Sequence, residues 1–177
     1  MNHPSSKQYR LLAIALSSRG LGYAVLEGKK FLVEYGSTSV KGDKNRLCQV
    51  KIEKLIALYQ PDALVLQDTT AKGSHRAPRI KMLNQQVIEA ARKQRLSVTL
   101  FSGKQLRSFI LGNAQGTKQE MAEMLVKHFP DELASRLPRR RRSWESADSR
   151  MDIFDAVGLA VTFRMTEAGS ATVDSQC

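Results

Sequence analysis

The chain has few cysteines and histidines, and these shortages exclude several kinds of site. Its two cysteines, Cys48 and Cys177, lie far apart and form no C-x-x-C pair, so the sequence predicts neither a zinc site nor a disulfide framework. We expect a core thiol and a tail thiol in a reducing compartment. The three histidines are scattered, and no two of them have the spacing of metal ligands.

Long apolar runs are also missing. The first ten residues, MNHPSSKQYR, are polar and contain no apolar segment of the kind found in secretory signals. No apolar stretch approaches the roughly 20 residues that a membrane-spanning helix needs. We therefore expect a cytoplasmic protein that does not bind membranes.

Positive charge, by contrast, is in excess. The 177 residues include 28 Lys and Arg against 17 Asp and Glu, which gives a net charge of +11. Such an excess favours a polyanionic partner, and nucleic acid is the commonest one for a compact domain. Hydrophobic residues make up 42% of the chain, which is enough for one domain with a full core.

The apolar pattern predicts one α/β domain. Residues 1–9 are interpreted as a flexible lead, residues 10–165 as the domain and residues 166–177 as a polar tail. Three strands in quick succession indicate an antiparallel meander, and the alternation of helices and strands after it implies parallel pairing with helices on both faces of a mixed sheet. The expected strands cover 10–16, 20–28, 31–40, 61–68 and 96–101, and the expected helices cover 44–60, 77–94, 118–129 and 152–163.

Three short motifs occur in a characteristic order. IALSSRGLGY (14–23) forms a strand and a tight turn, PDALVLQD (61–68) forms a later buried strand, and DIFDAVGLAVT (152–162) begins the last helix. In this order and spacing they resemble the RuvC-type Holliday-junction resolvases of the RNase H-like superfamily. The resemblance covers roughly residues 12–163, and it implies an RNase H-like mixed sheet, with a three-strand meander plus parallel strands.

The resemblance also locates the family's four acidic positions. Asp152 and Asp155 keep their acids, whereas Ala15 stands for the first-strand Asp and Gln67 for the fourth-strand Glu. In the family these acids hold two Mg²⁺ ions about 3.5–4 Å apart, and Mg²⁺ depends on carboxylates for its binding. Ala15 supplies neither charge nor oxygen, and Gln67 keeps an oxygen without the charge.

Asp152 and Asp155 are therefore expected to be the remnant of a catalytic site that holds at most one loose metal ion. Their i, i+3 spacing puts both on one face of a helix. Interaction with the helix dipole or capping explains Asp152 equally well, but it explains Asp155 less well. Asp68 is the obvious substitute acid, although strand alternation points it away from Gln67.

The candidate nucleic-acid-binding residues are Arg19 in the first turn and three groups, one of which lies in the loop and helix start after the fourth strand and contains Lys72, Arg76 and Arg79. Arg107 and Lys118 match basic positions of the family, and residues 136–147 form an arginine-rich loop that the family lacks. The full set is Arg19, Lys72, Arg76, Arg79, Arg107, Lys118, Arg139, Arg140, Arg141 and Arg142. Trp144, the one tryptophan, follows the arginine run; it either stacks on an unpaired base or anchors the loop to the core.

Three hypotheses follow. The leading one is a RuvC-like, catalytically degenerate protein that binds branched or structured DNA, such as four-way junctions, and needs no cofactor. The second is an active Mg²⁺- or Mn²⁺-dependent junction endonuclease with a rearranged site of Asp68, Asp152 and Asp155. The third is a protein that binds structured RNA or the ribosome.

A homodimer is expected, because a four-way junction has two-fold symmetry. The helix predicted at 77–94 carries an apolar stripe that either forms a dimer face or covers the sheet; its members are Ile80, Leu83, Val87, Ile88 and Ala91.

Overall fold

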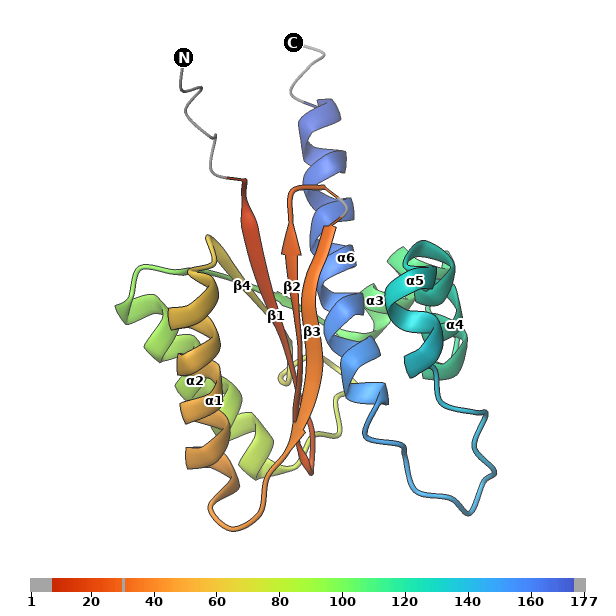
Figure 1. Cartoon of the computed structure of the whole chain (residues 1–177), viewed down its shortest axis with the longest axis horizontal. Helices are drawn as coiled ribbons and strands as arrows, with labels where there is room; N and C mark the ends of the chain where they lie inside the picture. Colours follow the sequence, from red (N-terminus) through yellow and green to blue (C-terminus); the bar gives the residue numbers. More distant parts are fainter. Residues whose placement is uncertain (1–7, 30, 174–177) are drawn as a thin grey trace.

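The computed structural model describes residues 8–29 and 31–173. Five strands form one mixed sheet in the order β3-β2-β1-β4-β5 (Figure 1). The β1–β2 and β2–β3 pairs are antiparallel, and the β1–β4 and β4–β5 pairs are parallel, which confirms the predicted meander and the parallel second half. The strands are β1 Arg10–Leu16, β2 Gly20–Glu27, β3 Phe31–Ser39, β4 Ala63–Gln67 and β5 Ser97–Phe101.

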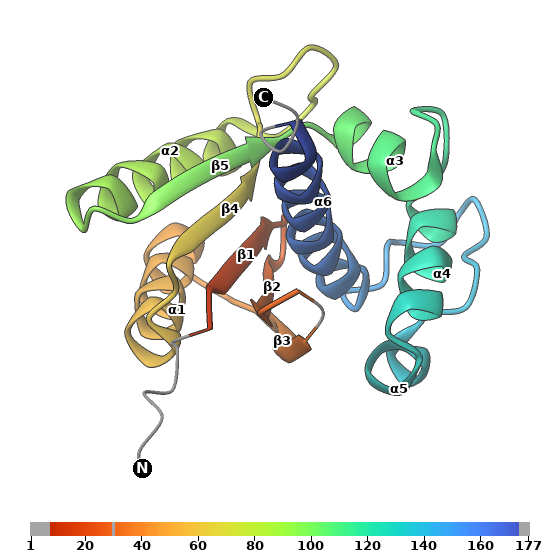
Figure 2. The ribbon, with the colours of Figure 1, turned by 90° about the horizontal axis from the view of Figure 1, so that it is seen from above.

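Helices cover both faces of the sheet, as the sequence predicts. Helices α1 and α2 lie on one face, and α6 crosses the other face with α3 and α4 beside it (Figures 1 and 2). The helical elements are α1 Lys44–Tyr59, α2 Pro78–Lys93, α3 Gly103–Leu111, α4 Lys118–His128, α5 Pro130–Leu133, the 3-10 turn η1 Ala134–Arg136 and α6 Met151–Val173. In the described part of the chain, no helix is both long enough and apolar enough to cross a membrane.

Strand β1 is buried on both faces, and its alternation decides which residues face the candidate site. Leu11, Ala13 and Ala15 belong to the core cluster that contains the apolar residues of α6. Their neighbours in the strand, such as Leu12 and Ile14, belong to the cluster under α1 and α2. Because successive side chains point to opposite faces, Ala15 lies on the side of the sheet that α6 covers.

Glycine at position 22 allows α6 to start close to the sheet. A Cβ atom on Gly22 would lie 1.9 Å from the carbonyl oxygen of Asp152, so any larger residue would push the helix away from β2. This contact fixes the first turn of α6 against the strand next to β1.

Several expectations for the helices need correction. The helical spacing of the apolar residues in 44–60, which includes Leu47, Val50, Leu55 and Leu58, does not mark one buried face: Leu55 is buried with Cys48 and Ile52, whereas the other three are exposed. The outer face of α1 is therefore partly apolar, and apolar spacing alone does not separate it from the buried face. Cys48 is the predicted core thiol, and burial raises its pKa; Cys177 lies outside the described residues.

The stripe on α2 covers the sheet. Four of its members are buried and the fifth is partly buried in the same core cluster, so this stripe is not available as a dimer face; they are Ile80, Leu83, Val87, Ala91 and Ile88.

The chain after β5 contains more helix than the sequence predicts. Helix α3 lies between the strand predicted at 96–101 and the helix predicted at 118–129, where the sequence predicts no regular element, and it begins at a capping box formed by Ser102 and Gln105. Helix α5 and η1 follow α4 directly. Helix α6 continues to Val173, so much of the expected polar tail is helical. The expected lead at 1–9 lies almost wholly outside the described residues.

Candidate functional site

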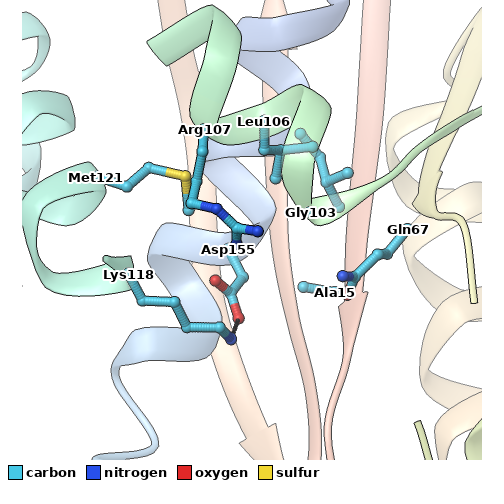
Figure 3. A pocket seen from close by; sticks show the side chains of 9 residues that line it. Ala15, Gln67, Gly103, Leu106, Arg107, Lys118, Met121 and Asp155 are labelled. Atoms are coloured by element: carbon cyan, nitrogen blue, oxygen red, sulfur yellow. Dashed lines mark hydrogen bonds and ion pairs between the residues drawn. The ribbon is translucent and has the colours of Figure 1, made fainter. Parts of the chain in front are cut away.

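The candidate site lies at the carboxyl ends of β1 and β4, facing the start of α6. A small open pocket there is lined by three of the four residues that the resemblance assigns to acidic positions, Ala15, Gln67 and Asp155, but not by Asp152 (Figure 3). Its lining residues are Ala15, Gln67, Gly103, Leu106, Arg107, Lys118, Met121, Asp155 and Leu159. The parallel pairing of β1 with β4 brings the first two together, and α3, α4 and α6 supply the rest.

Gln67 is bound by a cation from the loop after β4. Nη2 of Arg76 donates a hydrogen bond to Oε1 of Gln67, and Nη1 donates to the carbonyl oxygen of Leu16 at 3.3 Å. The backbone carbonyl of Gln67 accepts a hydrogen bond of 3.2 Å from Asn84. A guanidinium stays charged at all relevant pH values, so a fixed positive charge lies beside the position where the family has a glutamate.

Asp155 is also bound by a cation. Nζ of Lys118, the first residue of α4, lies 2.5 Å from Oδ2 of Asp155 (Figure 3). The Asp155 side chain is 14% exposed and that of Lys118 is 55% exposed, so the acid is held in the pocket while the lysine remains open to solvent.

Arg107 completes the basic lining of the pocket. Its Nε donates a hydrogen bond of 2.9 Å to the carbonyl oxygen of Ala114. A Cβ atom on Gly103 would lie 3.4 Å from Nη1 of Arg107 and 3.6 Å from Nε2 of Gln67. The Arg107 guanidinium and the Gln67 amide therefore lie on the same side of Gly103, and glycine leaves the space between them open.

Asp152 is bound by the turn between β1 and β2 and does not line the pocket. The Ser17 hydroxyl donates a hydrogen bond to its carboxylate, and Ser17 Oγ accepts from the backbone N–H groups of Arg19 at 3.3 Å and Gly20 at 3.2 Å. Burial raises the pKa of Asp152, the bond from Ser17 lowers it, and the charge of Asp155 raises it; the net direction is upward.

The donor set does not fit two Mg²⁺ ions. Within residues 8–29 and 31–173, no three His, Cys, Asp or Glu side chains come together in a way that could hold a metal ion. Asp68 is turned to its own loop, where Oδ1 accepts hydrogen bonds from the backbone N–H and the hydroxyl of Thr70 at 2.9 and 2.8 Å. The site offers two carboxylates, one of them ion-paired, and an amide, whereas Mg²⁺ needs several oxygen ligands with negative charge.

Five of the predicted basic residues meet at this end of the sheet. Besides Arg76, Arg107 and Lys118, Arg79 reaches the carbonyl oxygen of Ser17 at 3.3 Å. Arg19 lies near enough to Asp148 and Asp152 for its charge to act on both carboxylates. Lys72, in the loop after β4, is exposed to solvent.

The arginine-rich loop between η1 and α6 is irregular, as predicted, and an acidic residue organises it. The Glu145 carboxylate forms an ion pair with Arg139 and accepts a 2.8 Å hydrogen bond from the backbone N–H of Arg142. The backbone carbonyl oxygen of Glu145 accepts a 2.9 Å hydrogen bond from the Arg141 guanidinium. Arg140 binds both carboxylate oxygens of Glu123 on α4, at 3.0 and 2.8 Å.

The sequence analysis missed the residues that hold these cations in place. Gly103, Glu123 and Glu145 lie outside the three motifs, and Glu123 is 17 residues from the arginine it binds. The only available signal was the position of Ser17 inside the first motif, where the family has glycine.

Comparison with known proteins identifies the fold. No family model and no curated protein sequence matches the chain. Among solved structures, Thermus thermophilus RuvC matches with a TM-score of 0.67 and 16% identity, over 90% of this chain and 96% of that chain. The same protein in complex with a Holliday junction substrate matches with a TM-score of 0.67 and 16% identity, over 89% of this chain and 96% of that chain.

A second match is the yeast mitochondrial Holliday junction resolvase Ydc2, with a TM-score of 0.60 and 12% identity, over 90% of this chain and 79% of that chain. These likenesses agree with the three sequence motifs, and the chain therefore has the RuvC-type form of the RNase H-like fold.

Proposed function

We propose that this protein binds branched DNA, such as a four-way junction, and that it does not cut it. Solved structures with this fold include a RuvC bound to a Holliday junction substrate and a fowlpox virus resolvase bound to Holliday junction DNA. The net charge of +11, the two cations that line the pocket and the three arginines at the same end of the sheet favour the same polyanionic partner.

The observation that carries the proposal is the pairing of Gln67 with Arg76 and of Asp155 with Lys118. Both cations bind oxygen atoms at positions where the family's acids bind metal ions. A divalent cation entering the pocket would meet Arg107 and Lys118, with Arg76 beside Gln67, whereas a backbone phosphate would be attracted by these charges. The pocket thus favours holding a phosphate over activating a water molecule.

We also propose that the protein acts as a homodimer, since two symmetric copies match the two-fold symmetry of a junction. The exposed face of α1 supports this proposal in place of the α2 stripe. Leu47, Val50 and Leu58 lie on that face and are 42%, 38% and 71% exposed.

The test is a binding and cleavage experiment on synthetic four-way junctions. We expect a junction to bind more tightly than duplex DNA at one fixed salt concentration, equally well in EDTA and in Mg²⁺, with no nicking in Mg²⁺ or Mn²⁺. Metal-dependent nicking that is lost in Asp155→Ala would contradict the non-cutting part and favour a rearranged endonuclease. Tighter binding to structured RNA than to the junction would contradict the DNA part.

A further inference from the structure

Trp144 is the most exposed large hydrophobic residue of the chain's described part. Its side chain is 75% exposed, so it does not anchor the arginine-rich loop to the core. The loop is held by polar contacts instead, through Glu145 inside the loop and Glu123 on α4. Core packing therefore does not explain why a tryptophan lies in this loop, whose shape is held by polar contacts.

Arg142 accompanies the indole. Its guanidinium carbon lies 5.5 Å from the centre of the Trp144 ring, which is within cation–π distance. Arg139, Arg140 and Arg150 form ion pairs, but among the residues that the structure describes no acid pairs with the Arg142 guanidinium. Trp144 and Arg142 therefore present an aromatic surface and an unneutralised cation side by side.

The loop is tied to α4, the helix that supplies Lys118 to the candidate site. Beyond the pair of Arg140 with Glu123, Gln119 donates a 3.4 Å hydrogen bond to the carbonyl oxygen of Pro138, and both contacts tie the loop to α4. Helix α4 begins with Lys118 in the pocket, and the loop leads into α6, which carries Asp155. Figures 1 and 2 show the loop, in light blue, running between these two helices.

The charge of the segment selects the class of partner. Residues 135–150 contain six arginines and two acids, Glu145 and Asp148, so four positive charges remain in excess. A polyanion relieves the repulsion among them. The indole requires a planar ring with a free face, and bases inside a duplex have both faces covered by their neighbours. An unpaired base with its flanking phosphate satisfies both requirements.

We propose that Trp144 and Arg142 form a stacking site for an unpaired base at a DNA branch point, with the base on the indole and Arg142 on the adjacent phosphate. This inference rests on the proposed function and specifies what the loop adds to it: a preference for branches that carry unpaired bases.

The test uses the intrinsic fluorescence of the protein, because Trp144 is its single tryptophan. The probes are a four-way junction with two unpaired thymines at the branch point, a fully paired junction and a duplex of equal length. We expect the first to quench the fluorescence strongly and the duplex to quench it little. Trp144→Ala should weaken binding to the first probe roughly 5- to 150-fold, the effect of one lost base stack, with duplex binding unchanged and partial recovery in Trp144→Phe.

The matched control is Phe31→Ala, which removes another exposed aromatic residue, on the edge strand β3. Tight junction binding with unchanged fluorescence, and with equal affinity in Trp144→Ala, would overturn the stacking site and leave the proposed function intact. No binding to any of the DNA probes would overturn both. Stronger quenching by a single-stranded RNA loop than by the thymine junction would overturn the assignment to DNA.

Discussion

Nζ of Lys118 and Oδ2 of Asp155 lie 2.5 Å apart, joining the first residue of α4 to the second turn of α6. The lysine neutralises the one carboxylate that lines the pocket, as a bound metal ion does in a two-metal nuclease. It differs from a metal ion in having a flexible stem and a half-exposed head. It can therefore leave the carboxylate for a phosphate without any change of fold.

Replacing this lysine should weaken DNA binding. In Lys118→Ala the pocket loses a cation and leaves Asp155 uncompensated, so we expect about tenfold weaker junction binding and a logarithmic salt slope smaller by about 0.9. Lys127→Ala, in the last turn of the same helix, is the control and should bind normally. Adding Asp155→Asn to Lys118→Ala should recover part of the loss. Unchanged affinity in Lys118→Ala would contradict a phosphate contact in the pocket.

Restoring the two missing acids should make the fold sensitive to metal. Ala15 is 3% exposed, so Ala15→Asp buries a charge and lowers the free energy of unfolding by about 2–4 kcal/mol when no cation is bound. With Gln67→Glu added, carboxylates at positions 15, 67 and 155 line the pocket, and Mg²⁺ should recover stability by binding the folded state. Thermal unfolding with Mg²⁺ and with EDTA checks this, together with junction nicking. An equal Mg²⁺ effect on the parent protein would contradict it.

The sequence predicts most of the sheet and the place of the site because both depend on local patterns. Strand β1 begins and ends where its apolar run does, and the family resemblance carried by the three motifs points to Ala15, Gln67, Asp152 and Asp155. Helix α3 was missed because a nine-residue helix between glycines carries too few turns for a periodic signal.

The polar contacts of the site depend on long-range packing, which no local pattern records. Arg76 reaches Gln67 from an irregular loop, and Lys118 is 37 residues from Asp155. Whether Trp144 packs against the core or is exposed likewise depends on where the loop lies relative to α4, and the sequence alone does not decide between the two.

The raised pKa of Asp152 predicts a pH-dependent difference in stability. A folded-state pKa above the ordinary value means that the folded protein holds this proton more tightly than the unfolded chain does. The contribution of Asp152 to stability therefore falls as pH rises from its unfolded-state pKa to its folded-state pKa. Asp152→Asn removes the ionisation and keeps an oxygen that accepts from Ser17. Its free energy of unfolding, relative to the parent protein, should therefore increase between about pH 4 and pH 7. Urea unfolding at both pH values measures it, and a relative stability that falls with pH would contradict it.

The ion pair between Arg140 and Glu123 should control access to the arginine-rich loop. Both side chains are substantially exposed, at 72% and 31%, so Glu123→Gln should hardly change the melting temperature. It should loosen the attachment of the loop to α4, leaving the hydrogen bond from Gln119 to Pro138, and speed trypsin cleavage after residues 139–142, because proteases cut mobile exposed segments. Glu53→Gln on α1 is the control. Equal cleavage rates in the two variants would show that Glu123 does not hold the loop.

The exposed face of α1 should determine the oligomeric state. Leu58 is 71% exposed, so Leu58→Glu does not disturb the core of the monomer, but it places a charge in any interface built on this face. We expect the parent protein to have the mass of a dimer in light scattering and the variant to have that of a monomer. The variant should also bind junctions more weakly, since one copy makes half of the symmetric contacts. Phe31→Glu on β3 is the matched control and should stay dimeric. A monomeric parent protein, both free and on junction DNA, would contradict the dimer.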